Sequence, residues 1–154
     1  MTEYVDRINT KLCPNITEKE VVLDLFAGCG GLSLGFEAAG YKTIGFEMDA
    51  AAAATYEENL KGNCHAIKLD TNFEYPHAEI IIGGPPCQPF SVGGHQRGFE
   101  DARDGFPIFI DAVRKLNPRV FMFENVRGLL YTNKWYFELI ISELQKLGYV
   151  IDYK

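Results

Sequence analysis

Short β-rich runs alternate with segments of helical periodicity along almost the whole chain, and this alternation limits the possible folds more than any other feature. Strands are predicted over residues 20–26, 42–47, 64–69, 78–82, 118–124 and 148–153. Such alternation is typical of a parallel sheet covered by helices on both faces. We therefore expect an α/β fold with a doubly wound, mostly parallel sheet.

Four helices are predicted where apolar residues recur at spacings of three and four. Gly40 is placed to end the first helix, and Asp49 is placed to cap the second, which runs to Leu60. The first, third and fourth helices have the following positions at helical spacing: Leu32, Gly35, Phe36 and Ala39 in the first, Phe106, Phe109, Ile110 and Val113 in the third, and Phe137, Ile140, Ile141 and Leu144 in the fourth.

Composition indicates one domain over residues 1–154, because 47% apolar residues suffice for a core and no linker or repeat interrupts the pattern. No apolar run approaches the roughly 18 residues of a membrane span, and the polar N-terminus is unlike a secretory signal. We expect a cytoplasmic protein without membrane contact. The four widely spaced cysteines indicate free thiols, and the three histidines lack metal-ligand spacing, so no metal is assigned.

A glycine-rich turn follows the first strand, with Ala27, Gly28, Gly30 and Gly31 leading into a helix. Glycines let a ligand approach the backbone at a helix N-terminus, which favours a nucleotide. The dinucleotide pattern GxGxxG is not met, because Ser33 stands where the third glycine belongs. This disfavours a nicotinamide dehydrogenase. A tight turn without a ligand remains the alternative.

Acidic residues follow the second and third strands. Glu47, at the end of the second strand, is placed to accept hydrogen bonds from ribose hydroxyls. Asp70, at the end of the third, is placed to accept one from an exocyclic amine. Each acid taken singly could instead cap a helix or a turn. Glycine or acidic features at three successive strand ends favour the nucleotide site.

A loop of about twenty residues, from Gly83 to Asp104, follows the fourth strand, and loops of this length in compact domains are usually functional or mobile. It contains Cys87 within the sequence PPCQPFS. Prolines restrict the backbone and would hold a nucleophile in one orientation. A single cysteine is otherwise more often a small buried apolar residue.

The sequence PPCQPFS, together with DLFAGCGGLSLGFEAAG before it and FENV after it, resembles the cytosine-5 DNA methyltransferase family from about Val21 to Asp152. The resemblance implies a Rossmann-like methyltransferase fold, incomplete at its C-terminus, that binds S-adenosyl-L-methionine. It implies Cys87 as the nucleophile and Glu124 as the acid that binds the target cytosine. The cofactor-binding residues that it implies are Phe26, Ala27, Gly28, Gly30, Gly31, Leu32, Glu47, Met48, Asp70, Thr71 and Pro86.

The chemistry of this family explains these residue types. Carbon 5 of cytosine is a poor nucleophile, so the Cys87 thiolate adds to carbon 6 and makes carbon 5 able to attack the sulfonium methyl group. Glu124 stabilises the ring by protonating or hydrogen-bonding nitrogen 3, provided that burial keeps its carboxyl protonated. The target base must be flipped out of the duplex.

The rest of the loop is predicted to contact DNA, with the stretch 92–97 as a lid over the flipped base. The residues expected to contact double-stranded DNA or the target base are Pro86, Gln88, Ser91, Gly94, Gln96, Arg97, Arg103, Asn125 and Val126. The arginines could equally be solvated surface charges. A net charge of −6 is unfavourable for phosphate binding, so either the basic residues cluster locally or another polypeptide provides most of the DNA-binding surface.

Whole members of this family are longer and include an arginine that holds the base, a target-recognition domain and a returning C-terminal segment. We therefore expect one subunit of a split enzyme, whose partner adds strands beside the apolar edge at residues 148–153. Two alternatives stay open. The chain could act on cytosine in tRNA, or it could be a truncated module that binds S-adenosyl-L-methionine without catalysis.

Overall fold

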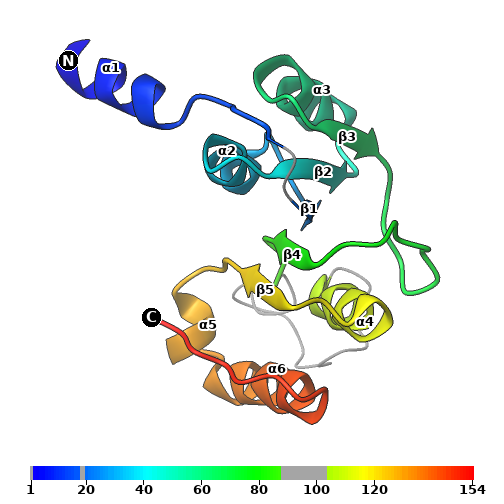
Figure 1. Ribbon diagram of the computed structural model, residues 1–154. Coiled ribbons are helices and arrows are strands. Elements are labelled where there is room, and N and C mark those ends of the chain that lie inside the picture. Colours follow the sequence, from blue (N-terminus) through cyan, green and yellow to red (C-terminus); the bar gives the residue numbers. More distant parts are fainter. Residues whose placement is uncertain (1, 18–19, 88–103) are drawn as a thin grey trace.

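The computed structural model describes residues 2–17, 20–87 and 104–154. Five strands form one sheet in the order β3-β2-β1-β4-β5, and all neighbouring pairs are parallel (Figure 1). The strands are β1 (Val21–Leu25), β2 (Lys42–Glu47), β3 (Asn63–Ala66), β4 (Ile80–Gly83) and β5 (Val120–Phe123). The predicted α/β class with a parallel sheet is confirmed.

Six helices accompany the described strands: α1 (Thr2–Lys11), α2 (Gly31–Ala38), α3 (Ala50–Asn59), α4 (Phe106–Leu116), α5 (Gly128–Tyr131) and α6 (Lys134–Lys146). The four predicted helices correspond to α2, α3, α4 and α6. Asp49 caps α3 by accepting from the amides of Ala51 and Ala52. Gly40 follows α2 with φ +96°, the left-handed conformation expected where a helix ends. Helices α1 and α5 were not predicted, and α1 projects from the body (Figure 1).

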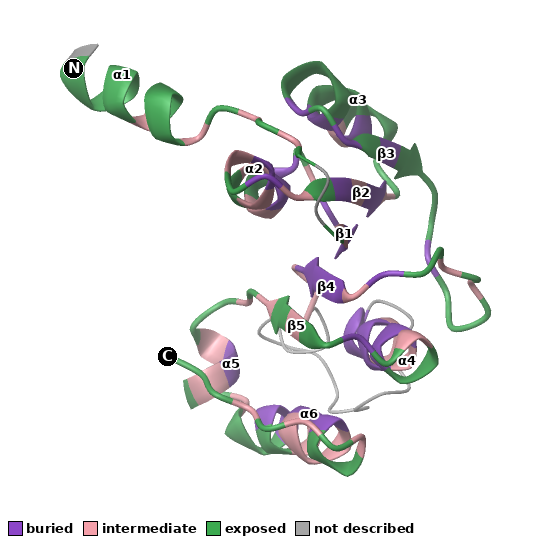
Figure 2. Ribbon diagram, viewed as in Figure 1, coloured by how far each residue is buried: buried purple, intermediate pink, exposed green. Residues whose placement is uncertain are grey.

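The helices cover the sheet from two sides. Helices α4 and α6 pack on the main core, which includes Leu23 and Leu25 of β1 and Ile81 of β4. On the opposite side, Val22 and Ile82 contact the apolar residues of α2, and Tyr56 of α3 and Leu60, which follows that helix, belong to a further cluster. The central strands are therefore buried on both faces, as Figure 2 shows for β1 and β4.

The predicted strand at residues 148–153 is wrong. Its alternation of side chains is present, since Val150 is 99% exposed and Tyr149 and Ile151 pack on the main core. The segment is nevertheless not part of the sheet. The Tyr149 ring lies 4.9 Å from that of Phe121, and its hydroxyl donates to the carbonyl of Pro118 at 2.7 Å. Side-chain packing therefore anchors an extended segment that lacks a ladder of backbone hydrogen bonds.

Candidate functional site

A cavity of about 420 Å³ lies at the carboxyl ends of β1, β2 and β4, next to the segment that follows β3. Four of its lining residues, Phe26, Glu47, Met48 and Pro86, were predicted as cofactor contacts. The others, which sequence reasoning missed, are Phe46, Ile67, Lys68, Leu69, Gly84, Asp104, Gly105 and Ile108. Their position just after strands or at the start of α4 could have suggested them, but only the fold brings these segments together.

The Glu47 carboxylate is held in a fixed orientation at the edge of this cavity. One oxygen accepts from the Gly28 amide at 2.9 Å and the other from the Asp49 amide at 2.8 Å. A carboxylate oxygen has about two acceptor positions, so each oxygen keeps one for another donor. Glu47 can therefore accept two further hydrogen bonds, as a pair of ribose hydroxyls would require.

The glycine loop from Ala27 to Gly31 brings the backbone of β1 to the N-terminus of α2. Gly28 and Gly30 have φ +54° and +86°, a conformation that favours glycine. A Cβ atom on Gly30 would lie 2.7 Å from the Tyr56 ring, so the absent side chain makes room for Tyr56. Phe26, also at positive φ, turns its ring against Gly105 at the entrance of α4.

Seven predicted cofactor residues are not among those that line the cavity: Ala27, Gly28, Gly30 and Gly31 of the glycine loop, and Leu32, Asp70 and Thr71. Leu32 packs against the apolar cluster of Val22, Ile80 and Ile82. Asp70 is exposed and accepts a hydrogen bond from the Asn72 amide, and the Thr71 carbonyl accepts one from Lys115. Their neighbour Leu69 lines the cavity. The roles of all seven in binding remain predictions.

Cys87 lies beside this cavity, on a segment held from two sides. The Gly105 amide donates to the Pro86 carbonyl at 2.8 Å, and Cys87 forms a β-bridge with Asp104. From the other side, the Asn125 side chain donates to the Pro85 carbonyl at 2.7 Å. Cys87 is half-buried, and burial, followed by the charge of Asp104, raises the pKa of its thiol to about 11. The thiol is therefore protonated at neutral pH in this state.

Glu124 follows β5 and is brought to the same end of the sheet. Its amide donates to the Gly83 carbonyl at 3.0 Å, and its carboxylate lies against Gly84, where an added Cβ atom would be 3.9 Å from Oε2. The side chain is exposed. Val126 is 68% exposed and faces a different pocket. The predicted contacts Gln88, Ser91, Gly94, Gln96, Arg97 and Arg103 lie outside the described residues, as does the proposed lid.

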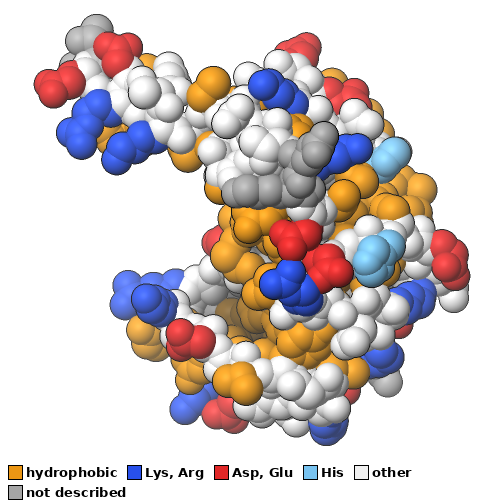
Figure 3. Space-filling model, in the orientation of Figure 1, with side chains coloured by type: hydrophobic (Ala, Val, Ile, Leu, Met, Phe, Trp, Pro, Cys, Tyr) orange, Lys and Arg blue, Asp and Glu red, His pale blue; other side chains and the backbone are white. Residues whose placement is uncertain are grey.

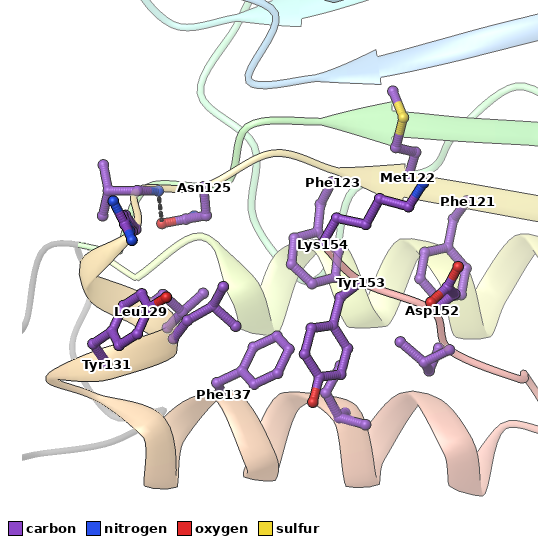
Figure 4. Close-up of a pocket in the computed structure, with 15 residues that line it drawn as sticks. Phe121, Met122, Phe123, Asn125, Leu129, Tyr131, Phe137, Asp152, Tyr153 and Lys154 are labelled. Atoms are coloured by element: carbon purple, nitrogen blue, oxygen red, sulfur yellow. Dashed lines mark hydrogen bonds between the residues drawn. The ribbon is translucent and has the colours of Figure 1, made fainter.

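A second hollow, of about 680 Å³, lies between β5, α5, α6 and the C-terminal segment. Aromatic side chains line it, including Phe121, Phe123, Phe137 and Tyr153 (Figure 4). Hydrophobic atoms are visible in this hollow from outside (Figure 3). Val120 and Met122, on the opposite face of β5, are 51% and 42% exposed. Apolar surface is thus open on both sides of β5.

Methyltransferases are among the solved structures with a similar fold. DNMT2 from Spodoptera frugiperda, solved as a mutant, aligns with a TM-score of 0.62 at 23% identity over 86% of this chain and 42% of that chain. A ribosomal protein L11 methylase from Lactobacillus delbrueckii aligns with a TM-score of 0.56 at 11% identity, covering 100% of this chain and 73% of the other. The fold is thus that of Rossmann-like, S-adenosylmethionine-dependent methyltransferases.

The sequence identifies the family within this class. A model of the C-5 cytosine-specific DNA methylases matches residues 21–154, and the chain belongs to this family. It is 57% identical to the Type II methyltransferase M.AplI of Arthrospira platensis over 99% of this chain and 44% of that protein. It is 41% identical to M.PspPI of a Psychrobacter strain over 84% of this chain and 33% of that protein. The chain thus spans less than half the length of these relatives.

No helix in the described ranges is long and apolar enough to cross a membrane.

Proposed function

We propose that this chain carries the cofactor site and the nucleophile of a DNA (cytosine-5) methyltransferase, and that it acts together with further polypeptide that recognises the DNA target. The observation that carries the proposal is the position of Cys87 beside a cavity suited to an adenosine. Membership of the family supports the reaction type. The M.AplI relative, a Type II methyltransferase, supports DNA rather than tRNA as the substrate.

The cavity fits S-adenosylmethionine in its donor set and its walls. Glu47 offers two acceptor positions for ribose hydroxyls, and the apolar side chains of Phe26, Phe46 and Ile108 provide surfaces for a flat base. When bound, the cofactor supplies a methyl group on a positively charged sulfur. The Glu47 carboxylate adds a favourable negative charge nearby.

The chain's own residues would carry the rest of the reaction. The Cys87 sulfur, after losing its proton, forms a bond to carbon 6 of a flipped cytosine, and the electron pair of the 5,6 double bond is used by carbon 5 to take the methyl group. Loss of the carbon 5 proton to a base then restores the double bond and expels the thiolate. Glu124 would bind nitrogen 3 in its protonated form. Its exposed carboxyl would become buried when the base enters.

The second polypeptide is proposed from the surface around β5. Its outer edge has no strand partner among the described residues, and it is flanked by exposed Val120 and Met122 and by the apolar hollow. The net charge of −6 also favours a basic partner surface for the phosphates. This polypeptide would complete the sheet and supply target recognition. It would be the second subunit of a split enzyme.

The decisive experiment is mass spectrometry of the chain with S-adenosylmethionine and a duplex that contains 5-fluorocytosine, with and without the products of neighbouring genes. Fluorine replaces the removable proton, so a working enzyme is trapped as an adduct on the Cys87 peptide. Cys87→Ser should lose the adduct, whereas Cys13→Ser, at an exposed thiol outside the site, should keep it.

Each alternative has its own outcome in this experiment. An adduct formed at a defined sequence by the monomeric chain alone would disprove the need for a partner. Methyl transfer to labelled tRNA but not to DNA would establish the RNA enzyme. Binding of S-adenosylmethionine without any adduct, whatever partner is added, would leave a non-catalytic module.

A further inference from the structure

Five buried polar side chains form one unbroken chain behind the glycine loop. Asp24 Oδ2 lies 2.7 Å from Ser33 Oγ, which lies 2.9 Å from the Tyr56 hydroxyl. That hydroxyl is 2.7 Å from Thr43 Oγ1, which is 2.6 Å from Glu37 Oε1. All five residues are at most 1% exposed, so bulk water does not reach them.

When both carboxyls are ionised, these five side chains bring one hydrogen too few for the contacts between them. Four contacts join the five side chains, but Ser33, Tyr56 and Thr43 bring only three hydroxyl hydrogens. One hydrogen cannot serve two contacts of this length well. The fourth contact would therefore bring lone pairs of two oxygens together in a buried place, which is strongly unfavourable. A proton on either carboxyl removes this conflict.

The surroundings of the two carboxyls decide where the proton resides. Glu37 accepts additional bonds from the amides of Gly62 at 2.7 Å and Lys61 at 2.8 Å, so each of its two oxygens already receives an amide hydrogen. Asp24 is less well supplied: besides the Ser33 hydroxyl it receives only the Ser33 backbone amide, and its Oδ1 is buried without a hydrogen-bond partner in the described structure.

The titratable groups around Asp24 point the same way. Glu47 on β2 and Cys64 on β3 interact with it electrostatically. Glu37, on α2, lies at the other end of the hydrogen-bonded series. Burial raises the pKa of Asp24 to about 6, and the Glu47 charge adds to the rise, while the bonds from Ser33 oppose it.

We propose that Asp24 carries a proton in the folded protein, and that this proton completes a directed hydrogen-bond chain to Glu37 that holds the glycine loop in its binding conformation. Asp24 and Tyr56 are then positioning residues. The Tyr56 ring links these hydrogen-bonded side chains to the glycine loop, because it packs directly on Gly30 of the loop and on Gly45 of β2. Added Cβ atoms at these two positions would lie 2.7 Å and 2.9 Å from the ring. Ser33 lies in the first turn of α2, directly after the loop. The consequence for cofactor binding rests on the proposed function, whereas the proton on Asp24 does not.

The first test is a carbon-13 NMR titration of the aspartate carboxyls in the whole chain. Asp24 should titrate near pH 6, and a midpoint at or below the ordinary value of 3.8 would overturn the proposal. Tyr56→Phe leaves two contacts, each supplied by its own hydroxyl hydrogen, so the Asp24 midpoint should fall. An unchanged midpoint in this variant would show that burial alone, and not the hydrogen count, holds the proton.

Tyr75→Phe is the matched control, because it removes a buried hydroxyl that has no partner among the described residues and does not belong to this chain. It should leave the Asp24 midpoint in place. If a variant does not fold, the titration of the unmodified chain still decides whether Asp24 is protonated.

The second test measures S-adenosylhomocysteine affinity by calorimetry on both sides of the Asp24 midpoint. The unmodified chain should bind several-fold more weakly above the midpoint. Asp24→Asn should keep the tighter affinity at both pH values, because its amide donates to Ser33 as the protonated acid does. Equal pH dependence in both proteins would contradict the positioning role. If no protein binds at any pH while Asp24 titrates near 6, the proposed function fails and the proton assignment stands.

Discussion

The β1–β2 part of the sheet and its β5 edge differ in how completely their side chains are covered. Around β1 and β2, the buried polar side chains Ser33, Glu37 and Thr43 are all hydrogen-bonded within the chain, and the central strand is almost entirely buried. Around β5, by contrast, two large apolar side chains face solvent on one side and an apolar hollow opens on the other. The β1–β2 part of the sheet is therefore largely covered by its own chain. The β5 edge, which positions Glu124, leaves apolar surface open to a partner.

The largest effect expected from this difference concerns Glu37. Glu37→Ala leaves the buried Thr43 hydroxyl, the buried Gly62 amide and the partly buried Lys61 amide without this acceptor, so we expect a loss of about 3–5 kcal/mol in the free energy of unfolding. Met122→Thr, on exposed β5, should change it by less than about 0.5 kcal/mol. Urea unfolding followed by circular dichroism measures both. Similar losses in the two variants would show that the β1–β2 region and the β5 edge do not differ in this way.

A smaller effect is expected at the glycine loop. Gly30→Ala places a methyl group 2.7 Å from Tyr56 and 2.9 Å from Leu60 in a left-handed backbone, so it should lower the free energy of unfolding by about 1–3 kcal/mol. Gly31→Ala is the matched control, because no atom lies within 4 Å of its added Cβ. It should be neutral or slightly stabilising. A neutral Gly30→Ala would mean that Tyr56 does not pack as described.

A prediction at the junction of the two regions concerns the Cys87 thiol. Asp104→Asn removes the negative charge that contributes to its high pKa, so the pKa should fall and the thiolate fraction at pH 8 should rise by up to about tenfold, equivalent to ~1.4 kcal/mol. The rate of alkylation by iodoacetamide, followed by peptide mass spectrometry, reports this fraction. In the unmodified protein the rate should increase with pH up to about 11, and in Asp104→Asn it should level off at a lower pH.

Cys13 and Cys29 are exposed and serve as internal standards in the same digest, since their rates should not change with Asp104→Asn. A slower Cys87 in the variant would mean that burial, the larger cause of the raised pKa, had increased.

Local patterns predicted most of this fold because they report on burial and on helix ends. The apolar spacing of Phe106, Phe109 and Ile110 gave the buried face of α4, and Asp49 caps α3 as expected. Helix α1 was missed because its residues are exposed and follow no apolar stripe that packs on the body. Residues 148–153 were misassigned because alternation shows that one side is covered, not that a neighbouring strand exists.

The candidate site was predictable to the extent that its residues follow strand ends. Glu47 and Cys87 are of this kind: Glu47 lines the cavity, and Cys87 is bridged to Asp104, which lines it. Asp104 was missed because its link to Cys87 spans the long loop, and Tyr136, whose hydroxyl donates to Asp104, comes from a helix far along the chain. The proton on Asp24 depends on counting hydrogens across four elements, which no local pattern contains.

The smallest expected effect is at the C-terminal segment beside the hollow. Tyr153 is 61% exposed and its ring meets that of Phe137 edge-on at 4.9 Å, so Tyr153→Ala should lower the free energy of unfolding by about 1 kcal/mol or less. Tyr149→Ala should cost more, because that ring packs on Phe121 and its hydroxyl is bonded to Pro118.

Amide exchange separates this description from a paired strand. No amide of residues 150–154 donates a backbone hydrogen bond within the described structure, so these amides should exchange at nearly unfolded rates while those of β1 are protected. Protection of Val150 to Tyr153 in the isolated chain would show that the segment already pairs. Protection that appears only when a further polypeptide is added would locate the surface that this polypeptide covers. The open surface at β5 would then be a feature of the isolated chain that the added polypeptide removes.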